Sequence, residues 1–503
     1  MRAVKDSIVT ILVVMMALFF LAGCESMLHE PNVRTDVKPE EFGKKYLPEE
    51  LKSDLKMLME TLEAVHPNLY ANTSKSEIDS LRWILEQELT TPMTRIEFYF
   101  KVAPIVARFG DAHTNVGVPW EEFKYYQSKP EGFLFPFNIT YDTLLGVTIT
   151  RNYSNDSVLA VGNRIVSING CSMDSLFFFF LRVFSGERIV YRQMCVAGYL
   201  RMLLWLNNIH PPYDLLVQQR GSQEQIARRV GGVTSKEFRK IDSLLTMRST
   251  VFRKYWGYNY ERLQDSIGFI DFRAMINLEE FRKFLSTTFT DIQTKPIKGL
   301  IIDLRGNGGG DPRLGLELLP FITDSSYRMA QRVERRMSAQ YKAYVRKMAP
   351  WWLRWFPWTW VNSEMRKYLA VQDGEIIIDT PAVEPPDANS LRYRGKTCFL
   401  IGCRTFSGAM ILANIVADFK LATLIGEETG GIPTAYGTIY PFDLPNTKLH
   451  MSVSIAFFVR ANGNTKDRRG IIPDIEVRQT EIGIPLGKDT VLERARQWII
   501  AGK

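Results

Sequence analysis

The chain of 503 residues is poor in the two residue types that most often build metal and redox sites. It has five cysteines, none in a Cys-x-x-Cys pair, and five histidines, none in a His-Glu-x-x-His motif. This scarcity excludes a disulfide scaffold, a zinc ribbon and a thioredoxin-like site, and it disfavours a zinc hydrolase. No Gly-Lys-Ser/Thr follows the glycine-rich stretch at 306–310, which excludes a P-loop. We therefore expect no metal and no cofactor.

The balance of charge is also unremarkable for a chain of this length. The formal net charge of +8 is modest and does not by itself predict binding to nucleic acid, so no nucleic-acid partner is expected. A hydrophobic fraction of 46% excludes a disordered chain. At about 100–200 residues per domain, the length predicts two to four domains.

One apolar run stands near the N-terminus. Arg2 and Lys5 precede residues 8–20, which are apolar except for Thr10, and the run ends in Leu-Ala-Gly-Cys at 21–24. It is shorter than the roughly 20 residues that a membrane-spanning helix needs, which favours a removable signal peptide. Leu-Ala-Gly-Cys resembles a bacterial lipoprotein signal. The resemblance implies a signal peptide at 1–23, lipidation of Cys24 and a membrane anchor in the bacterial cell envelope, facing the periplasm or the exterior.

The pattern of apolar residues then divides the mature chain into regions. After a polar tether at 24–46, helical spacing at 51–65, 75–89 and 95–109 predicts a helical domain over 47–118. Short β-type runs separated by turns fill 119–235 and resemble a PDZ-like peptide-binding module. Strands and helices alternate over 236–480, which predicts an α/β core, and a C-terminal helix is expected within 481–503.

An insertion at about 325–385 interrupts the α/β core. It has a run of basic residues followed by five tryptophans within ten residues: Trp351, Trp352, Trp355, Trp358 and Trp360. One interpretation is a helical lid whose aromatic side chains pack on the core. The other is an interfacial element that touches anionic lipid near the anchor.

Three elements of the sequence could carry chemistry. Ser407 follows a buried strand at the first turn of a helix, where free N–H groups would stabilise an oxyanion, although an ordinary N-cap serine fits the same position. The stretch Asp-Leu-Arg-Gly-Asn-Gly-Gly-Gly at 303–310 predicts a loop whose amides cradle an anion or oxyanion. His113 is a candidate base for the serine, although a lone histidine after Gly-Asp-Ala also fits a capping or surface role.

Five motifs in one order strengthen these hypotheses. They are Gly-Asp-Ala-His-Thr at 110–114, the loop at 303–310, Ser407, Gly-Glu-Glu-Thr-Gly-Gly at 426–431 and Gly-Ile-Ile-Pro-Asp at 470–474. Together they resemble the tail-specific serine peptidases, which include the carboxy-terminal processing and tricorn-like enzymes. The resemblance implies an α/β fold with a crotonase/ClpP-like peptidase core, an N-terminal helical domain and a PDZ-like β-rich domain.

The same resemblance assigns the catalytic base. The Ser-Lys branch of the family has a lysine after the Gly-Glu-x-Thr-x-Gly motif, and Ile432 stands there in this chain. The resemblance therefore implies the Ser-His branch, with Ser407 as nucleophile and His113 as base. It also implies an acid before the Gly-x-x-Pro-Asp motif that orients the histidine, best matched by Asp467.

Other site residues follow from the resemblance with alternatives left open. Glu427 and Asp111 are alternative partners for the histidine. The backbone amides of Gly309 and Gly408 are expected to form the oxyanion hole.

The expected function is that of a cell-envelope serine endopeptidase that cleaves polypeptides or their C-terminal regions. The alternative is a non-catalytic lipoprotein on the same fold that binds a peptide or an apolar ligand. The sequence does not predict the oligomeric state.

Overall fold

The computed structural model describes residues 37–248, 257–348, 368, 370–478, 483 and 488–501. Three predictions lie outside these residues: the signal peptide at 1–23, the lipidated Cys24 and the tryptophan cluster at 351–360. Within the described part of the chain, no helix is both long and apolar enough to span a membrane.

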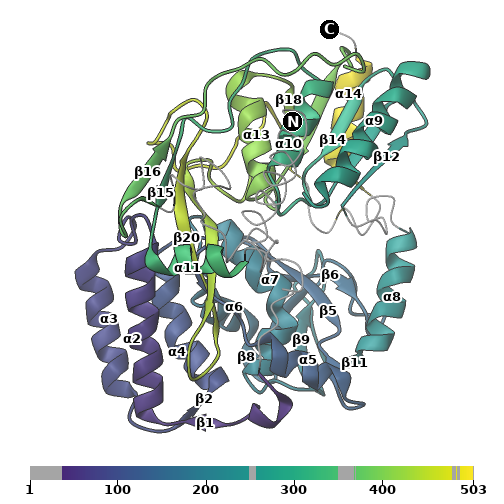
Figure 1. Cartoon of the computed structure of the whole chain (residues 1–503). Helices are drawn as coiled ribbons and strands as arrows, with labels where there is room; N and C mark the ends of the chain where they lie inside the picture. The colour runs from purple at the N-terminus through teal and green to yellow at the C-terminus, as the bar shows by residue number, and fades with distance from the viewer. Residues whose placement is uncertain are drawn as a thin grey trace.

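Three helices form the N-terminal region, at the lower left of Figure 1. They are α2 (Pro48–Val65), α3 (Lys75–Glu88) and α4 (Arg95–Ala107), close to the predicted stretches. Ser74 and Thr94 begin α3 and α4 by accepting hydrogen bonds from backbone N–H groups in the first turn. The chain leaves α4 directly into the loop that contains His113.

An antiparallel sheet forms the β-rich region that the sequence predicts at 119–235. Its strands run in the order β10-β9-β7-β6-β5, with β8 paired to β7. Their bounds are β5 (Phe137–Asp142), β6 (Gly146–Asn152), β7 (Arg164–Ile168), β8 (Cys171–Ser172), β9 (Tyr213–Gln218) and β10 (Gln225–Val230). Two helices between β8 and β9, α6 (Met173–Leu181) and α7 (Ile189–Leu206), contribute many of the buried apolar side chains of this region.

Short elements complete the lower half of the molecule. They are η2 (Pro39–Glu41), β1 (Lys45–Tyr46) paired with β2 (Met93–Thr94), β4 (Phe133–Leu134) paired with β11 (Val233–Thr234), α5 (Trp120–Ser128) and α8 (Ser235–Arg248).

The core, at the top of Figure 1, is a six-stranded sheet in the order β12-β13-β14-β17-β18-β21. The strands are β12 (Tyr258–Arg262), β13 (Gly268–Phe272), β14 (Leu300–Asp303), β17 (Thr397–Ile401), β18 (Thr423–Gly426) and β21 (Ile475–Glu476), and β13 to β21 pair in parallel. The core helices are α9 (Leu278–Thr294), α10 (Arg313–Leu318), α13 (Gly408–Phe419) and α14 (Thr490–Ile500), with the short η3 (Leu319–Phe321).

Helices cover both faces of this sheet, as the run of buried apolar residues in its strands requires. Ile302 and Phe399 pack with residues of α9 and α13, whereas Ile301 and Leu400 pack with residues of α14. The α/β core predicted from the strand and helix alternation is therefore confirmed. The thiol of Cys398 is buried on the α14 face. Among the described residues, Cys171, Cys195, Cys398 and Cys403 form no disulfide.

A second sheet joins the core to the N-terminal helices. It has the order β16-β15-β20-β19, with β15 (Arg332–Arg336), β16 (Ile376–Asp379), β19 (Ala435–Asp443) and β20 (His450–Val459). The short β3 (Asn115–Val116) pairs with β20. Because β3 follows His113 by two residues, this pairing draws the histidine loop from the helices to the core. Figure 1 shows β20 running from the core down beside the N-terminal helices.

The expected insertion at 325–385 is not a purely helical lid. Its described part consists of β15, α11 (Ala339–Met348) and β16, and both strands are hydrogen-bonded into the second sheet. The sequence does not predict β15, because four of its five residues are charged. Its pairing partner β20 is also more than a hundred residues away. The segment is thus an integral part of the fold at its two ends.

Candidate active site

Ser407 lies in a strained turn between β17 and α13. Its backbone has φ 49° and ψ −122°, a region that a residue with a Cβ rarely adopts. Such strain costs on the order of 1–3 kcal/mol and persists where the surrounding structure enforces it, most often at functional sites. Although Ser407 precedes α13, its side chain makes no capping hydrogen bond. The ordinary N-cap interpretation of this serine is therefore wrong.

His113 reaches the serine from the loop after α4. Its Nε2 lies 3.3 Å from Oγ of Ser407, although 294 residues separate the two in sequence. This separation is slightly longer than the hydrogen bond of an engaged general base, as is common at sites without substrate, where the bond tightens on binding. The histidine loop is fixed to the second sheet by the hydroxyl of Ser452, which donates to the carbonyl of His113 over 3.0 Å.

Glycines allow the backbone of the 303–310 loop to approach the serine. A Cβ on Gly309 would lie 2.7 Å from Cβ of Ser407, and a Cβ on Gly408 would lie 2.7 Å from the carbonyl oxygen of Gly310. Gly309 also has φ +107°, which disfavours any residue with a side chain. The glycine-rich loop therefore packs directly against the turn that presents Ser407.

Part of the chain matches a known protein family. Residues 266–477 match the sequence profile of Peptidase family S41. The matched stretch, called the S41 domain from here on, covers less than half of the chain. No curated protein has a significant match to the chain.

Solved structures of CPAF share the fold over most of the chain. Mature CPAF complexed with lactacystin has a TM-score of 0.59 at 15% identity, over 90% of this chain and 99% of that chain. A CPAF mutant has a TM-score of 0.60 at 14% identity, over 90% of this chain and 97% of that chain. The likeness extends well beyond the S41 domain and includes the N-terminal half.

One of the two expected oxyanion donors is engaged elsewhere. The N–H of Gly309 donates to Oδ1 of Asn307 over 2.8 Å, so the expectation for the Gly309 amide is wrong. Gly408 is the first residue of α13, and N–H groups in a first helical turn have no acceptor within the helix. Its amide remains the candidate donor, next to the positive end of the helix dipole.

Asn307 fixes the glycine loop of the S41 domain to its surroundings. Its Nδ2 donates to the carbonyl of Phe272 over 2.9 Å, and its own carbonyl accepts from the N–H of Phe406 over 3.1 Å. The side chain is fully buried. Asn307 therefore connects β13, the glycine loop and the residue before Ser407, a role that the sequence alone did not reveal.

Arg305 explains the Asp-Leu-Arg part of the same motif. Its guanidinium forms ion pairs with Asp303 at 2.6 Å and with Asp489, at the start of α14, at 2.7 Å. Burial lowers the pKa of Arg305, but the two carboxylates outweigh it and raise the pKa above its usual range. This arginine holds the loop to α14 and does not point to the serine pair.

Asp111 lies beside the imidazole of His113. Its Oδ1 lies 3.9 Å from Nδ1 of His113 and accepts the backbone N–H of the same residue over 2.9 Å. Its Oδ2 accepts hydrogen bonds from Thr114 Oγ1 at 2.5 Å, Ser454 Oγ at 2.6 Å and His66 Nε2 at 3.2 Å. Burial alone would raise the pKa of Asp111, but the hydrogen bond from His66 and the other donors hold it well below its usual range.

His66 carries its ring proton on the side of Asp111. Its Nδ1 accepts the backbone N–H of Asn68 over 3.1 Å, so Nε2 is the donor to the carboxylate. The side chain is 1% exposed and packs on the ring of Tyr436. His66 was not predicted as a site residue, because it is 45 residues from Asp111 and belongs to none of the family motifs.

The other two candidate acids have different surroundings. Asp467 pairs with Arg460 at 3.2 Å, and its Oδ1 accepts the backbone N–H of Arg469 over 3.0 Å. The backbone N–H of Glu427 donates to the carbonyl of Ile401. Asp111, by contrast, has its Oδ1 3.9 Å from Nδ1 of the His113 ring.

Glu187 is an additional acid beside the histidine loop. Burial, with the charge of Asp111 next in size, raises its pKa to about 7, although the nearby His113 and the amide of Ala112 act in the opposite direction. Its Oε1 is buried and has no hydrogen-bond partner among the described residues. No motif surrounds Glu187, so no signal in the sequence could have identified it.

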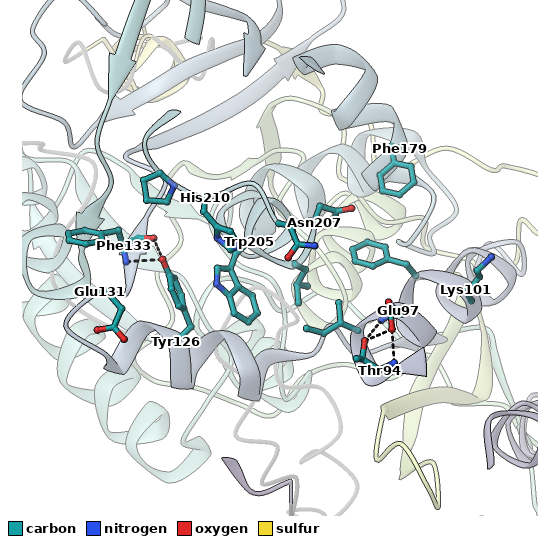
Figure 2. A pocket seen from close by; sticks show the side chains of 15 residues that line it. Thr94, Glu97, Lys101, Tyr126, Glu131, Phe133, Phe179, Trp205, Asn207 and His210 are labelled. Atoms are coloured by element: carbon teal, nitrogen blue, oxygen red, sulfur yellow. Dashed lines mark hydrogen bonds between the residues drawn. The ribbon is translucent and has the colours of Figure 1, made fainter. Parts of the chain in front are cut away.

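One pocket of note lies apart from the serine–histidine pair. The described residues contain no group of three or more His, Cys, Asp or Glu side chains that could hold a metal ion. The pocket, of about 950 Å³, lies between α4, α5 and α7, and Figure 2 shows aromatic side chains such as Tyr126 and Trp205 on its wall. Neither Ser407 nor His113 lines it, so this pocket is distinct from the serine–histidine pair.

Proposed function

We propose that the protein is a serine endopeptidase in which Ser407 is the nucleophile and His113 is the general base. The observation that carries this proposal is the 3.3 Å approach of Nε2 to a hydroxyl held in a strained turn. The strained turn holds the hydroxyl away from the helix N–H groups that an N-cap serine would bind. The S41 domain supports the same assignment.

The reaction would proceed by acyl transfer. Oγ of Ser407 attacks a peptide carbonyl carbon while Nε2 of His113 takes the hydroxyl proton, and the imidazolium then gives that proton to the departing amine. Water then attacks the acyl carbon while His113 takes a proton from it, and the imidazolium returns that proton to Oγ of Ser407 as the acid product leaves. The amide of Gly408 would hold the oxyanion, and loss of one such donor typically costs about 3–4 kcal/mol of transition-state stabilisation.

Asp111 would keep the base in place. The carboxylate anchors the backbone of His113 and stays ionised through its hydrogen bonds to three neighbouring side chains. A fixed negative charge 3.9 Å from Nδ1 also favours the imidazolium that forms during the reaction. In this proposal Asp111 takes the place that the family resemblance gives to Asp467.

The substrates would be polypeptides or their C-terminal regions, met in the bacterial cell envelope. The Leu-Ala-Gly-Cys sequence at 21–24 supports an anchor on Cys24. Incorporation of labelled fatty acid into the expressed full chain, and its loss in Cys24→Ser, would test the anchor. Incorporation that is unchanged in the variant would contradict it.

Hydrolysis of an unfolded polypeptide by the purified protein tests the catalytic proposal. We expect Ser407→Ala to abolish turnover. Ser172→Ala is the matched control, because Ser172 is an ordinary N-cap that accepts the N–H of Ser175 at the start of α6. Equal activity of Ser407→Ala and wild type would overturn the assignment, whereas no activity in the wild type under any condition would favour the binding-only alternative.

A further inference from the structure

A row of three aromatic rings connects the β-rich region to the catalytic pair. The ring of Tyr191, on α7, stacks on that of Phe406 with centroids 4.4 Å apart and planes 19° apart. Phe406 stacks in turn on the imidazole of His113, at 5.3 Å and 21°. Phe406 directly precedes Ser407 in the chain, so the middle ring of this row contacts the base and belongs to the neighbour of the nucleophile.

The middle ring is held in its place. The N–H of Phe406 donates to the carbonyl of Asn307, and a Cβ on Gly431 would lie 2.9 Å from the Phe406 ring. The absence of a side chain at Gly431 thus leaves the space that this ring occupies. Phe406 therefore has little freedom on the side of the S41 domain, and Tyr191 closes one of its faces.

The outer ring is also fixed. Tyr191 is 3% exposed, and its side chain is hydrogen-bonded to that of Cys195, one turn along α7. Because both residues belong to one helix, the position of the Tyr191 ring follows the position of α7.

The segment just before α7 is joined to both sides of the site. On the nucleophile side, Arg188 donates to the carbonyl of Thr429 and forms an ion pair with Glu428 at 3.0 Å. On the base side, the N–H of Ser185 donates to Oδ1 of Asn115 over 3.3 Å, two residues after His113. The start of α7 is therefore set relative to both catalytic residues, and the tyrosine is placed with it.

We propose that Tyr191 is a positioning residue for His113 and acts through the ring of Phe406. This inference rests on the proposed function of the Ser407–His113 pair. An imidazole stacked on Phe406 can turn about its Cβ–Cγ bond only if the row loosens, and such a turn moves Nε2 away from Oγ. Stacked aromatic pairs of this kind are stabilised enough that losing one would reduce the population of the aligned ring by about 3- to 10-fold.

Two substitutions separate the stacking ring from the hydroxyl. Tyr191→Phe keeps the ring and loses the bond to Cys195, and we expect kcat close to wild type. Tyr191→Leu loses the ring, and we expect kcat per titrated active site to fall about 3- to 10-fold with KM little changed. Tyr141→Leu is the matched control, since it removes a similar stack on Phe177 in the same region but away from the site.

Counting active sites by titration removes the contribution of unfolded protein, so a merely structural role would leave the rate per site unchanged. Equal kcat per site for Tyr191→Leu and Tyr191→Phe would overturn the inference. A loss of similar size in Tyr141→Leu would overturn it as well.

A measurement without turnover distinguishes this failure from failure of the proposed function. The imidazole resonances of His113, assigned with His113→Asn in histidine-labelled protein, report the ring stacked on Phe406. We expect them to move in Tyr191→Leu and to stay in Tyr191→Phe. Unmoved resonances in Tyr191→Leu would contradict the positioning role even if the wild type proved inactive, whereas an inactive wild type with moved resonances would contradict only the peptidase proposal.

Discussion

The two halves of the proposed catalytic pair are held by different physical means. On the nucleophile side, Ser407 is fixed by backbone sterics. Its φ is 49°, and a Cβ placed on Gly309 of the glycine loop would lie 2.7 Å from the Cβ of Ser407. On the base side, His113 is fixed by side-chain hydrogen bonds that converge on Asp111 from distant parts of the chain.

This difference predicts different responses to substitution. A site set by sterics tolerates almost no added atom close by but depends little on distant polar groups. A site set by a buried carboxylate depends on the ionisation and satisfaction of that group. Apart from the two catalytic residues themselves, substitutions on the nucleophile side should therefore mainly lower the rate, and those on the base side should mainly change the stability and its pH dependence.

The largest effect should come from removing the base itself. We expect His113→Ala to reduce kcat/KM for an unfolded polypeptide by about 10²–10⁴, the usual contribution of general base catalysis. The fold should persist, because the loop backbone keeps its bonds to Asp111 and Ser452. Steady-state kinetics with circular dichroism as the folding control would check this, and a loss below tenfold would contradict the role of His113.

The steric side is probed by adding one methyl group. Gly309→Ala places a Cβ against Ser407 at a backbone φ of +107°, and we expect activity to fall by about 10², because small displacements of a nucleophile cost that much. Gly306→Ala is the control in the same loop, since a Cβ there meets nothing within 4 Å. Equal kcat for the two variants would show that sterics do not set the position of Ser407.

The hydrogen-bonded side is probed by removing one charge. Asp111→Asn leaves the buried donors of Thr114, Ser454 and His66 facing a weaker acceptor, and we expect a loss of about 1–3 kcal/mol in the free energy of unfolding. Asp467→Asn should cost less, because that carboxylate is partly exposed. Urea titrations measure both. Lower activity in Asp467→Asn than in Asp111→Asn would return the orienting role to Asp467.

An effect no larger than this one concerns pH and Glu187. Its pKa of about 7 in the folded protein lies above the ordinary 4.5, so between these values the folded state binds its proton more tightly than the unfolded state. Ionisation therefore lowers the free energy of unfolding as pH rises from about 5 to about 7, by roughly 1–3 kcal/mol. Glu187→Gln should remove this loss. The free energy of unfolding of the variant, relative to that of the wild type, should therefore be higher at pH 8 than at pH 5.

Glu428→Gln provides a control of opposite sign. Burial raises the pKa of Glu428, but the bonds from Arg469 and Gly470 and the charge of Arg188 lower it overall. The stabilisation from its ionised form is therefore present above its ordinary pKa and lost as pH falls, so this variant should lose stability at neutral pH. A pH-independent difference between Glu187→Gln and wild type would contradict the burial of an ionising Glu187.

Much of the fold was predictable because its signals are local. Buried apolar runs at 300–304 and 397–401 correspond to β14 and β17, and the serine that opens the following helix is where a nucleophile would be expected. The pairing of Ser407 with His113 was predictable only from the order of the family motifs, because no local pattern connects residues 294 positions apart.

What could not be predicted depends on long-range packing or on backbone orientation. Whether the amide of Gly309 faces an oxyanion or Asn307 is decided by glycine dihedral angles that the sequence leaves open. Asp111 lies two residues before His113 in sequence, but two of the groups that hold its carboxylate, His66 and Ser454, reach it only through long-range packing. Glu187 lies beside Asp111 and His113 just before α7 begins, and no sequence motif marks this position.

Covalent labelling of the purified protein by a fluorophosphonate, with the modified residue located by peptide mapping, tests the central claim most directly. An activated serine predicts adduct on Ser407 in the wild type and little or none in His113→Ala. Folded wild-type protein without adduct on Ser407, or labelling just as fast without the imidazole, would contradict a histidine-activated nucleophile.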